Sequence, residues 1–97
     1  MRSDLEGRKI TIYLEGDLNS FNADSVENDL ESILKGKKLD SVVLDFNDLN
    51  YISSAGLRII LRIKKRYDDL TLINLSEDVY KVFEMVGFDS LLTIERK

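Results

Sequence analysis

Short stretches of the chain alternate apolar and polar residues, which is the pattern of β-strands. Between residues 9 and 15, Ile10, Ile12 and Leu14 have polar or amphipathic neighbours, as expected for a strand with one buried face. Residues 41–46, SVVLDF, are almost continuously apolar and predict a central strand buried on both faces. Further strands are predicted at residues 2–6, followed by a turn at Gly7, and at residues 70–75 and 91–94.

Three segments between these strands carry apolar residues every three or four positions, which predicts amphipathic helices. The second helix follows Ser53 and Ser54. Phe21 is expected to pack against Val26 as a hydrophobic staple at the start of the first helix. The other helix boundaries are predicted at the N-caps Asn22 and Ser76 and at the terminating glycines Gly36 and Gly87.

The order of these elements predicts one α/β domain over residues 1–97, with a small mixed β-sheet and helices packed on it. A chain of 97 residues has room for one hydrophobic core. A strand, a helix and a second strand in succession form a right-handed unit with parallel strands. No repeat or low-complexity linker interrupts this order, so function is expected at the loops and helix ends.

Composition and charge exclude several kinds of site and argue against several classes of partner. The chain has no cysteine and no histidine, which removes disulfides, thiolates and the commonest general base and zinc ligand. It contains no apolar run of the roughly 18 residues that a membrane span needs, so we expect a soluble intracellular protein without a membrane partner. The net charge of −4 argues against direct binding to nucleic acid.

Two serines stand where a predicted parallel strand gives way to the second helix, in the stretch LDFNDLNYISSAGLRIILRIKK. One reading is structural: a serine caps the helix, and Gly56 allows close packing. The other is functional, because open α/β sheets place their sites at the carboxyl ends of strands, where helix N-termini attract anions. The junction alone favours the structural reading.

The second helix also carries a basic stripe. Arg58, Arg62 and Lys65 are spaced four and three residues apart and therefore share one face. This face either is simply solvated or meets an acidic partner. Arg58 lies in the first turn, where a cation opposes the helix dipole, so a phosphate on Ser54 is a second candidate for its partner.

Other candidate chemistry is weaker. Asp45, Asp48 and Asn50 are read as strand-end and turn residues and not as a magnesium site, and no phosphate-binding loop motif occurs. A serine hydrolase would need an activating base and a nucleophile elbow, and Ile52 occupies a position where that elbow requires glycine. Phe21 and Met85 could be exposed anchors near the serine loop, and a core position fits each of them at least as well.

Taken together, the segments GDLNSFNA (16–23), LDFNDLNYISSAGLR (44–58) and LSEDVYKVFEMVGFDSLLTI (75–94) resemble the STAS domain, and within it the bacterial anti-sigma factor antagonists. Matching through Gly56 and Leu57 places Ser54 at the serine that the partner, an anti-sigma factor with serine kinase activity, phosphorylates in this family. Ser53 then replaces a frequent aspartate and is a competing acceptor. Ala55 replaces a second Ser or Thr, and Asn19 replaces an acid.

The resemblance implies a cytoplasmic, bacterial binding protein that is a monomer or weak homodimer, with no enzymatic activity, catalytic residues, metal or cofactor of its own. It would free a sigma factor by binding the anti-sigma factor, and phosphorylation of Ser54 would switch it off. The alternative is a STAS docking subunit of another sensory or transport assembly. The residues expected to bind the partner are Asn19, Ser20, Phe21, Asn22, Ser53, Ser54, Ala55, Gly56, Arg58 and Arg62.

Overall fold

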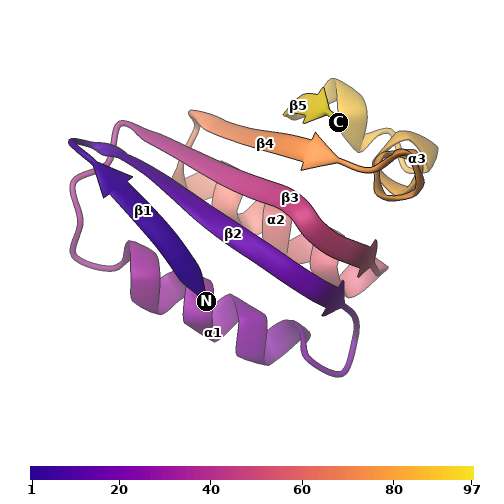
Figure 1. Ribbon diagram of the computed structural model, residues 1–97, viewed down its shortest axis with the longest axis horizontal. Coiled ribbons are helices and arrows are strands. Elements are labelled where there is room, and N and C mark those ends of the chain that lie inside the picture. The colour runs from indigo at the N-terminus through magenta and orange to yellow at the C-terminus, as the bar shows by residue number, and fades with distance from the viewer.

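Five strands form one sheet in the order in which they occur along the chain (Figure 1). The computed structural model describes residues 1–97. In chain order the elements are β1 (Arg2–Glu6), β2 (Lys9–Leu18), α1 (Ala23–Leu34), β3 (Ser41–Ile52), α2 (Ser54–Arg66), β4 (Leu70–Leu75), α3 (Glu77–Met85), a 3₁₀ turn (Phe88–Ser90) and β5 (Thr93–Arg96).

The sheet is mixed, as the sequence predicts. β1 and β2 form an antiparallel hairpin, and Gly7 lies in its turn at a φ of 63°, a left-handed conformation that suits glycine. β2, β3, β4 and β5 are paired in parallel, each joined to the next by a helical connection. The hairpin, the parallel pairing of β3 with β4 and the predicted α/β fold class are therefore confirmed.

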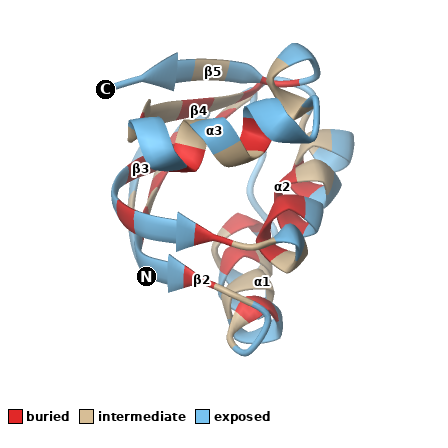
Figure 2. Ribbon diagram, turned by 90° about the vertical axis from the view of Figure 1, so that its right-hand side faces the viewer, coloured by how far each residue is buried: buried red, intermediate tan, exposed pale blue.

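The helices cover one face of the sheet, and Figure 2 shows the buried positions of α1 and α2 on the sides that face it. Alternate residues of β3 point to this face, among them Leu44 and Phe46, which are completely buried. The Phe46 ring packs edge-on against Phe83 of α3, with ring centroids 6.0 Å apart. One cluster of 22 buried apolar residues thus joins the sheet to the helices.

The predicted turn at Asp48–Asn50 is wrong, because β3 continues through it to Ile52. Leu49 is buried and pairs with Gly16 of β2, which also runs longer than predicted. Two irregularities in the β2–β3 register accommodate the polar residues. Burial of Leu49 and pairing with β2 therefore outweigh the turn preference of the flanking polar residues.

The C-terminal elements largely follow the sequence. Ser76 caps α3, with its Oγ accepting from the Val79 amide at 3.3 Å, and Gly87 after the helix has a φ of 77°. The last strand begins at Thr93, later than predicted, because residues 88–90 form a 3₁₀ turn first. None of the helices is long and apolar enough to cross a membrane.

Candidate functional site

The carboxyl ends of β2 and β3 lie next to each other and bring the loop at residues 19–22 beside the two serines. Leu18 and Ile52, the last residues of these strands, are sheet partners. The Ser53 amide continues the pairing by donating to the Leu18 carbonyl at 2.9 Å. Two segments that are more than 30 residues apart in the sequence therefore form one continuous surface.

Gly56 sets how closely the first turn of α2 approaches the ends of β2 and β3. A Cβ added to Gly56 would lie 2.7 Å from Cγ1 of Ile52 and 2.8 Å from Cγ of Leu18, closer than real side chains approach. Only glycine lets the first turn of α2 rest on the ends of both strands. The close packing predicted for Gly56 is confirmed.

The two serines have different roles. Ser53 is the N-cap of α2: its Oγ accepts from the Gly56 amide at 3.4 Å, and the residue is half-buried. Ser54 is the first residue of the helix, and its exposed side chain takes no part in the cap. The capping role therefore belongs to Ser53, and the Ser54 hydroxyl is left available.

Reciprocal asparagine hydrogen bonds build the neighbouring loop. Oδ1 of Asn19 accepts from the amides of Phe21 at 2.9 Å and Asn22 at 3.1 Å. Asn22 accepts from the Asn19 amide at 2.9 Å through Oδ1 and donates to the Asp17 carbonyl at 2.7 Å through Nδ2. Asn22 occupies the N-cap position of α1, but its side chain makes no cap hydrogen bond because the loop uses it.

The loop turns Phe21 outward, so the predicted staple with Val26 is wrong. The Phe21 side chain is 97% exposed. Of the two placements that the sequence left open for Met85, the structure shows the exposed one, since that residue is 84% exposed. Tyr51, which is half-exposed and pairs with Asp17 across the two strands, is a further exposed aromatic near the ends of these strands that the sequence did not single out. An aromatic directly before the buried Ile52 was its only sequence signal.

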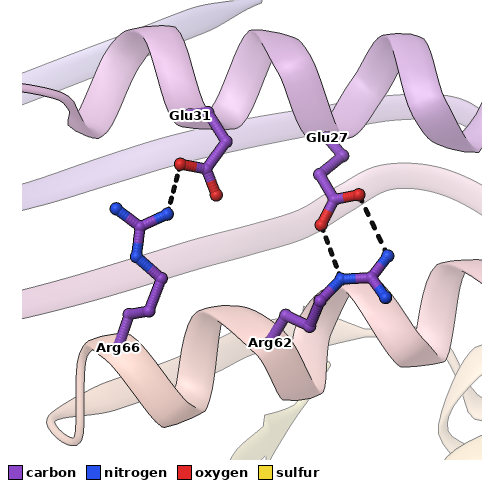
Figure 3. Close-up of polar contacts among 4 residues, drawn as sticks. All are labelled: Glu27, Glu31, Arg62 and Arg66. Carbon is purple, nitrogen blue, oxygen red and sulfur yellow. Dashed lines mark hydrogen bonds and ion pairs between the residues drawn. The ribbon is translucent and has the colours of Figure 1, made fainter.

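The basic stripe divides into paired and unpaired cations. Arg62 donates from Nε and Nη2 to the Glu27 carboxylate of α1, at 2.7 and 2.9 Å, and Arg66 pairs with Glu31 one turn later (Figure 3). Hydrogen bonding to these carboxylates, and then their charge, raises the pKa of both guanidinium groups. Arg58 is exposed and belongs to none of the ion pairs of the fold. Arg62 is thus engaged within the fold, whereas Arg58 is free.

The two carboxylates that were considered as magnesium ligands, Asp45 and Asp48, have separate hydrogen-bond partners. The Asp45 carboxylate, on the sheet face opposite the helices, accepts from the Asn74 side-chain amide at 3.1 and 3.2 Å and from the Asn47 amide at 2.8 Å. Asp48 accepts instead from the Asn47 side chain at 3.0 Å. Asp45 thus links β3 to Asn74 of β4, whereas the Asp48 carboxylate bonds only to its neighbour within β3.

The serines lie on an open surface. Four hollows occur on the molecule, and neither serine lines any of them. A polar rim with exposed aromatic side chains and no enclosing cavity suits a protein partner better than a small substrate.

Comparison with known proteins identifies relatives over nearly the whole chain. The STAS domain model matches residues 4–97. A protein of Bordetella bronchiseptica named as an anti-sigma factor antagonist, BtrV, is 41% identical over 86 residues, which cover 84% of this chain and 72% of that protein.

Solved structures share the fold at lower identity. One is named as an anti-sigma factor antagonist of Thermotoga maritima, and it has a TM-score of 0.88 at 19% identity. The match covers 99% of this chain and 86% of that protein's chain. The anti-sigma factor antagonist SpoIIAA of Bacillus is similar in its unphosphorylated form, with a TM-score of 0.77, 18% identity and coverage of 96% and 85%. The phosphorylated form of SpoIIAA is similar with a TM-score of 0.68 at 17% identity, and the match covers 96% of this chain and 88% of that one.

The division of roles between the serines has a measurable consequence. Ser53→Ala removes the cap of α2 and should lower the free energy of unfolding by about 1 kcal/mol. Ser54→Ala removes an exposed hydroxyl and should change it by less than about 0.5 kcal/mol. Urea denaturation followed by circular dichroism measures both variants. A larger loss for Ser54→Ala than for Ser53→Ala would contradict the assignment of the cap.

Proposed function

The chain belongs to the STAS domain family, and from this premise we propose that it is an anti-sigma factor antagonist. It binds an anti-sigma factor that is also a serine kinase, and this binding frees a sigma factor in the cytoplasm. Phosphorylation of Ser54 ends the binding. The observation that carries the proposal is the exposed, uncommitted Ser54 hydroxyl at the start of α2, beside a Ser53 that is committed to the cap.

A phosphate on Ser54 is compatible with the free domain. It adds about −1.5 to −2 charges at a helix N-terminus, where the dipole stabilises an anion by about 0.3–2 kcal/mol. Arg58, four residues later on the same helix face, is free of other ion pairs and adds a favourable charge. Phosphorylation of Ser53 would instead take its Oγ out of the hydrogen bond that caps α2. Ser54 is therefore the favoured acceptor.

The same phosphate is incompatible with a partner that covers the serine. Burying it in an interface costs several kcal/mol per ion unless the partner supplies matching charges. Reversing an equilibrium from 99:1 to 1:99 requires about 5.5 kcal/mol. Desolvation of one phosphate is of the magnitude needed to release the partner while the domain stays folded.

The proposed binding surface combines the asparagine loop with the first turn of α2. It comprises the exposed and half-buried residues Asn19, Ser20, Phe21, Asn22, Ser53, Ser54, Ala55 and Arg58, and the buried Gly56 lies beneath them. We leave out Arg62, because the Glu27 carboxylate holds its guanidinium against α1. Within this surface Asn19 and Asn22 set the loop conformation, and Gly56 sets the position of the serines.

We further propose that the domain catalyses no reaction and acts through binding alone. No histidine is present in the chain, and Ser54 lies on an open surface without an activating base among its hydrogen-bond partners. The kinase chemistry then belongs to the partner. If the captured partner binds ATP, the proposed function is supported over that of a docking subunit in a sensory or transport assembly.

Phosphorylation tests the switch directly. A pull-down with the wild-type chain should recover an ATP-binding protein, and the purified partner with ATP should add one phosphate, located on Ser54 by mass spectrometry. Ser54→Ala should block the reaction and still bind. Ser54→Asp should weaken the complex, though less than phosphate does, because it supplies one charge and fewer acceptor oxygens.

Two results would contradict this proposal. Phosphate on Ser53 would overturn the assignment of the acceptor. A tight complex in which ATP leads to no phosphorylation of either serine and no dissociation would instead indicate a constitutive docking subunit.

The free cation near Ser54 gives a second test. We propose that Arg58 faces an acidic surface of the partner, so Arg58→Glu should slow association by roughly threefold or more at low salt, because charge complementarity acts mainly on encounter. Stability should be almost unchanged, since the side chain is exposed and unpaired. Lys65→Glu, an exposed charge reversal in the last turn of the same helix, is the matched control. Equal association rates for the wild type and Arg58→Glu, measured by stopped flow, would show that Arg58 is simply solvated.

A further inference from the structure

Phe21 is an exposed aromatic in a fixed position. Single exposed apolar residues are common, so exposure alone carries no inference. The setting of Phe21 is different, because the backbone on both sides of it is held. Its own amide donates to Asn19, and its neighbour Asn22 is bonded to Asn19 and to the Asp17 carbonyl.

The ends of this loop are fixed by burial. Leu18, directly before it, is 1% exposed, and Ala23, directly after it, is 6% exposed. Only four residues separate these two core positions, and their side-chain hydrogen bonds close the loop on itself. Phe21 therefore stands out from a loop whose conformational entropy has already been lost on folding.

An aromatic side chain on a preorganised backbone is well suited to anchor an interface, because phenylalanine, tyrosine and tryptophan are enriched in interface cores. Hot spots in interfaces are enriched in large side chains that enter desolvated pockets, and preorganisation lowers the entropy cost of binding. The hydrogen bond between the Ser53 amide and the Leu18 carbonyl places this loop next to the serines. The loop itself carries no charge, so its outward face offers an apolar contact beside a position that phosphate would make anionic.

We propose that Phe21 is the anchor of the interface: its ring inserts into an apolar pocket of the anti-sigma factor, beside the surface that Ser54 controls. This inference rests on the proposed function and adds the residue that supplies most of the affinity. Phosphate on Ser54 then acts next to the anchor, where its desolvation opposes insertion of the ring.

The surface of the chain favours this occupant over a second copy. The one hollow lined mainly by apolar residues has a volume of about 50 Å³, whereas a cavity that holds benzene measures about 150 Å³. The other three hollows are lined by at most one hydrophobic residue each. No pocket on this chain would accept the Phe21 ring of another copy.

Truncation of the ring tests the anchor. With the purified anti-sigma factor from the pull-down as the probe, Phe21→Ala should weaken binding about 30-fold in calorimetry, the loss typical of a hot spot. The thermal midpoint should be unchanged, because the ring is 97% exposed in the free chain. Met85→Ala, which removes a side chain that is 84% exposed at the end of α3, is the control and should change affinity less than twofold.

A second measurement reports insertion of the ring. The chain contains no tryptophan, so Phe21→Trp labelled with 5-fluorotryptophan gives a single ¹⁹F signal. Addition of the partner should shift this signal and protect it from a soluble paramagnetic probe. The same label at position 85, in Met85→Trp, should remain accessible.

The possible outcomes distinguish failure of the Phe21 anchor from failure of the proposed function. If Ser54→Asp weakens the complex and Phe21→Ala does not, the function stands and the anchor is wrong. If Phe21→Ala abolishes self-association of the chain and leaves the partner affinity unchanged, the occupant is a second copy and the proposal is overturned. If the wild-type chain binds no anti-sigma factor, both proposals fail.

Discussion

The contact between Gly56 and the ends of β2 and β3 positions the whole candidate surface. No other residue could place the first turn of α2 within van der Waals distance of Leu18 and Ile52 without moving a buried side chain. This contact brings Ser53 into hydrogen-bond distance of Leu18, and so joins the serines to the loop that follows β2. The relative positions of Ser54 and Phe21 depend on it.

Once α2 is in place, adjacent residues can serve different purposes. Ser53 accepts a hydrogen bond from an amide at the N-terminus of α2. A phosphate on Ser54 would therefore add charge without loss of this cap. Glu27 and Glu31 hold Arg62 and Arg66 between α1 and α2, whereas Arg58 stays available near the serines. Such exposed ion pairs contribute little to stability individually, but bidentate geometry aligns the two helices that begin at the surface.

Much of this fold could be predicted from the sequence because its patterns are local. Alternation predicted the strand at 9–15 and a nearly continuous apolar run predicted the strand at 41–46, and the boundary residues Ser76 and Gly87 behave as their chemistry predicts. The position of the serines followed from the strand-to-helix junction. The same junction predicted close packing at Gly56, although not that Leu18 and Ile52 are the residues it packs against.

The remaining features depend on contacts between segments distant in the sequence, or on competition for a single side chain. β3 extends through a polar stretch because Leu49 is buried and β2 offers a pairing partner. Asn22 has the chemistry of a cap, yet the loop backbone and Asn19 take its hydrogen bonds, and Phe21 is turned outward as a result. The pairing of Arg62 with Glu27 joins residues 35 positions apart and required the parallel packing of α1 and α2.

The central claim is that phosphate on Ser54 acts on the interface and not on the fold. The most direct measurement compares fully phosphorylated and unmodified chain in the same two assays: urea unfolding, and affinity for the anti-sigma factor. The free energy of unfolding of the phosphorylated chain should equal that of the unmodified chain or exceed it by up to about 2 kcal/mol. The affinity should fall at least about 100-fold, as expected when a charge worth several kcal/mol of desolvation enters the interface. A phosphorylated chain that binds as tightly as the unmodified one, or that loses affinity only because it unfolds, would contradict the account.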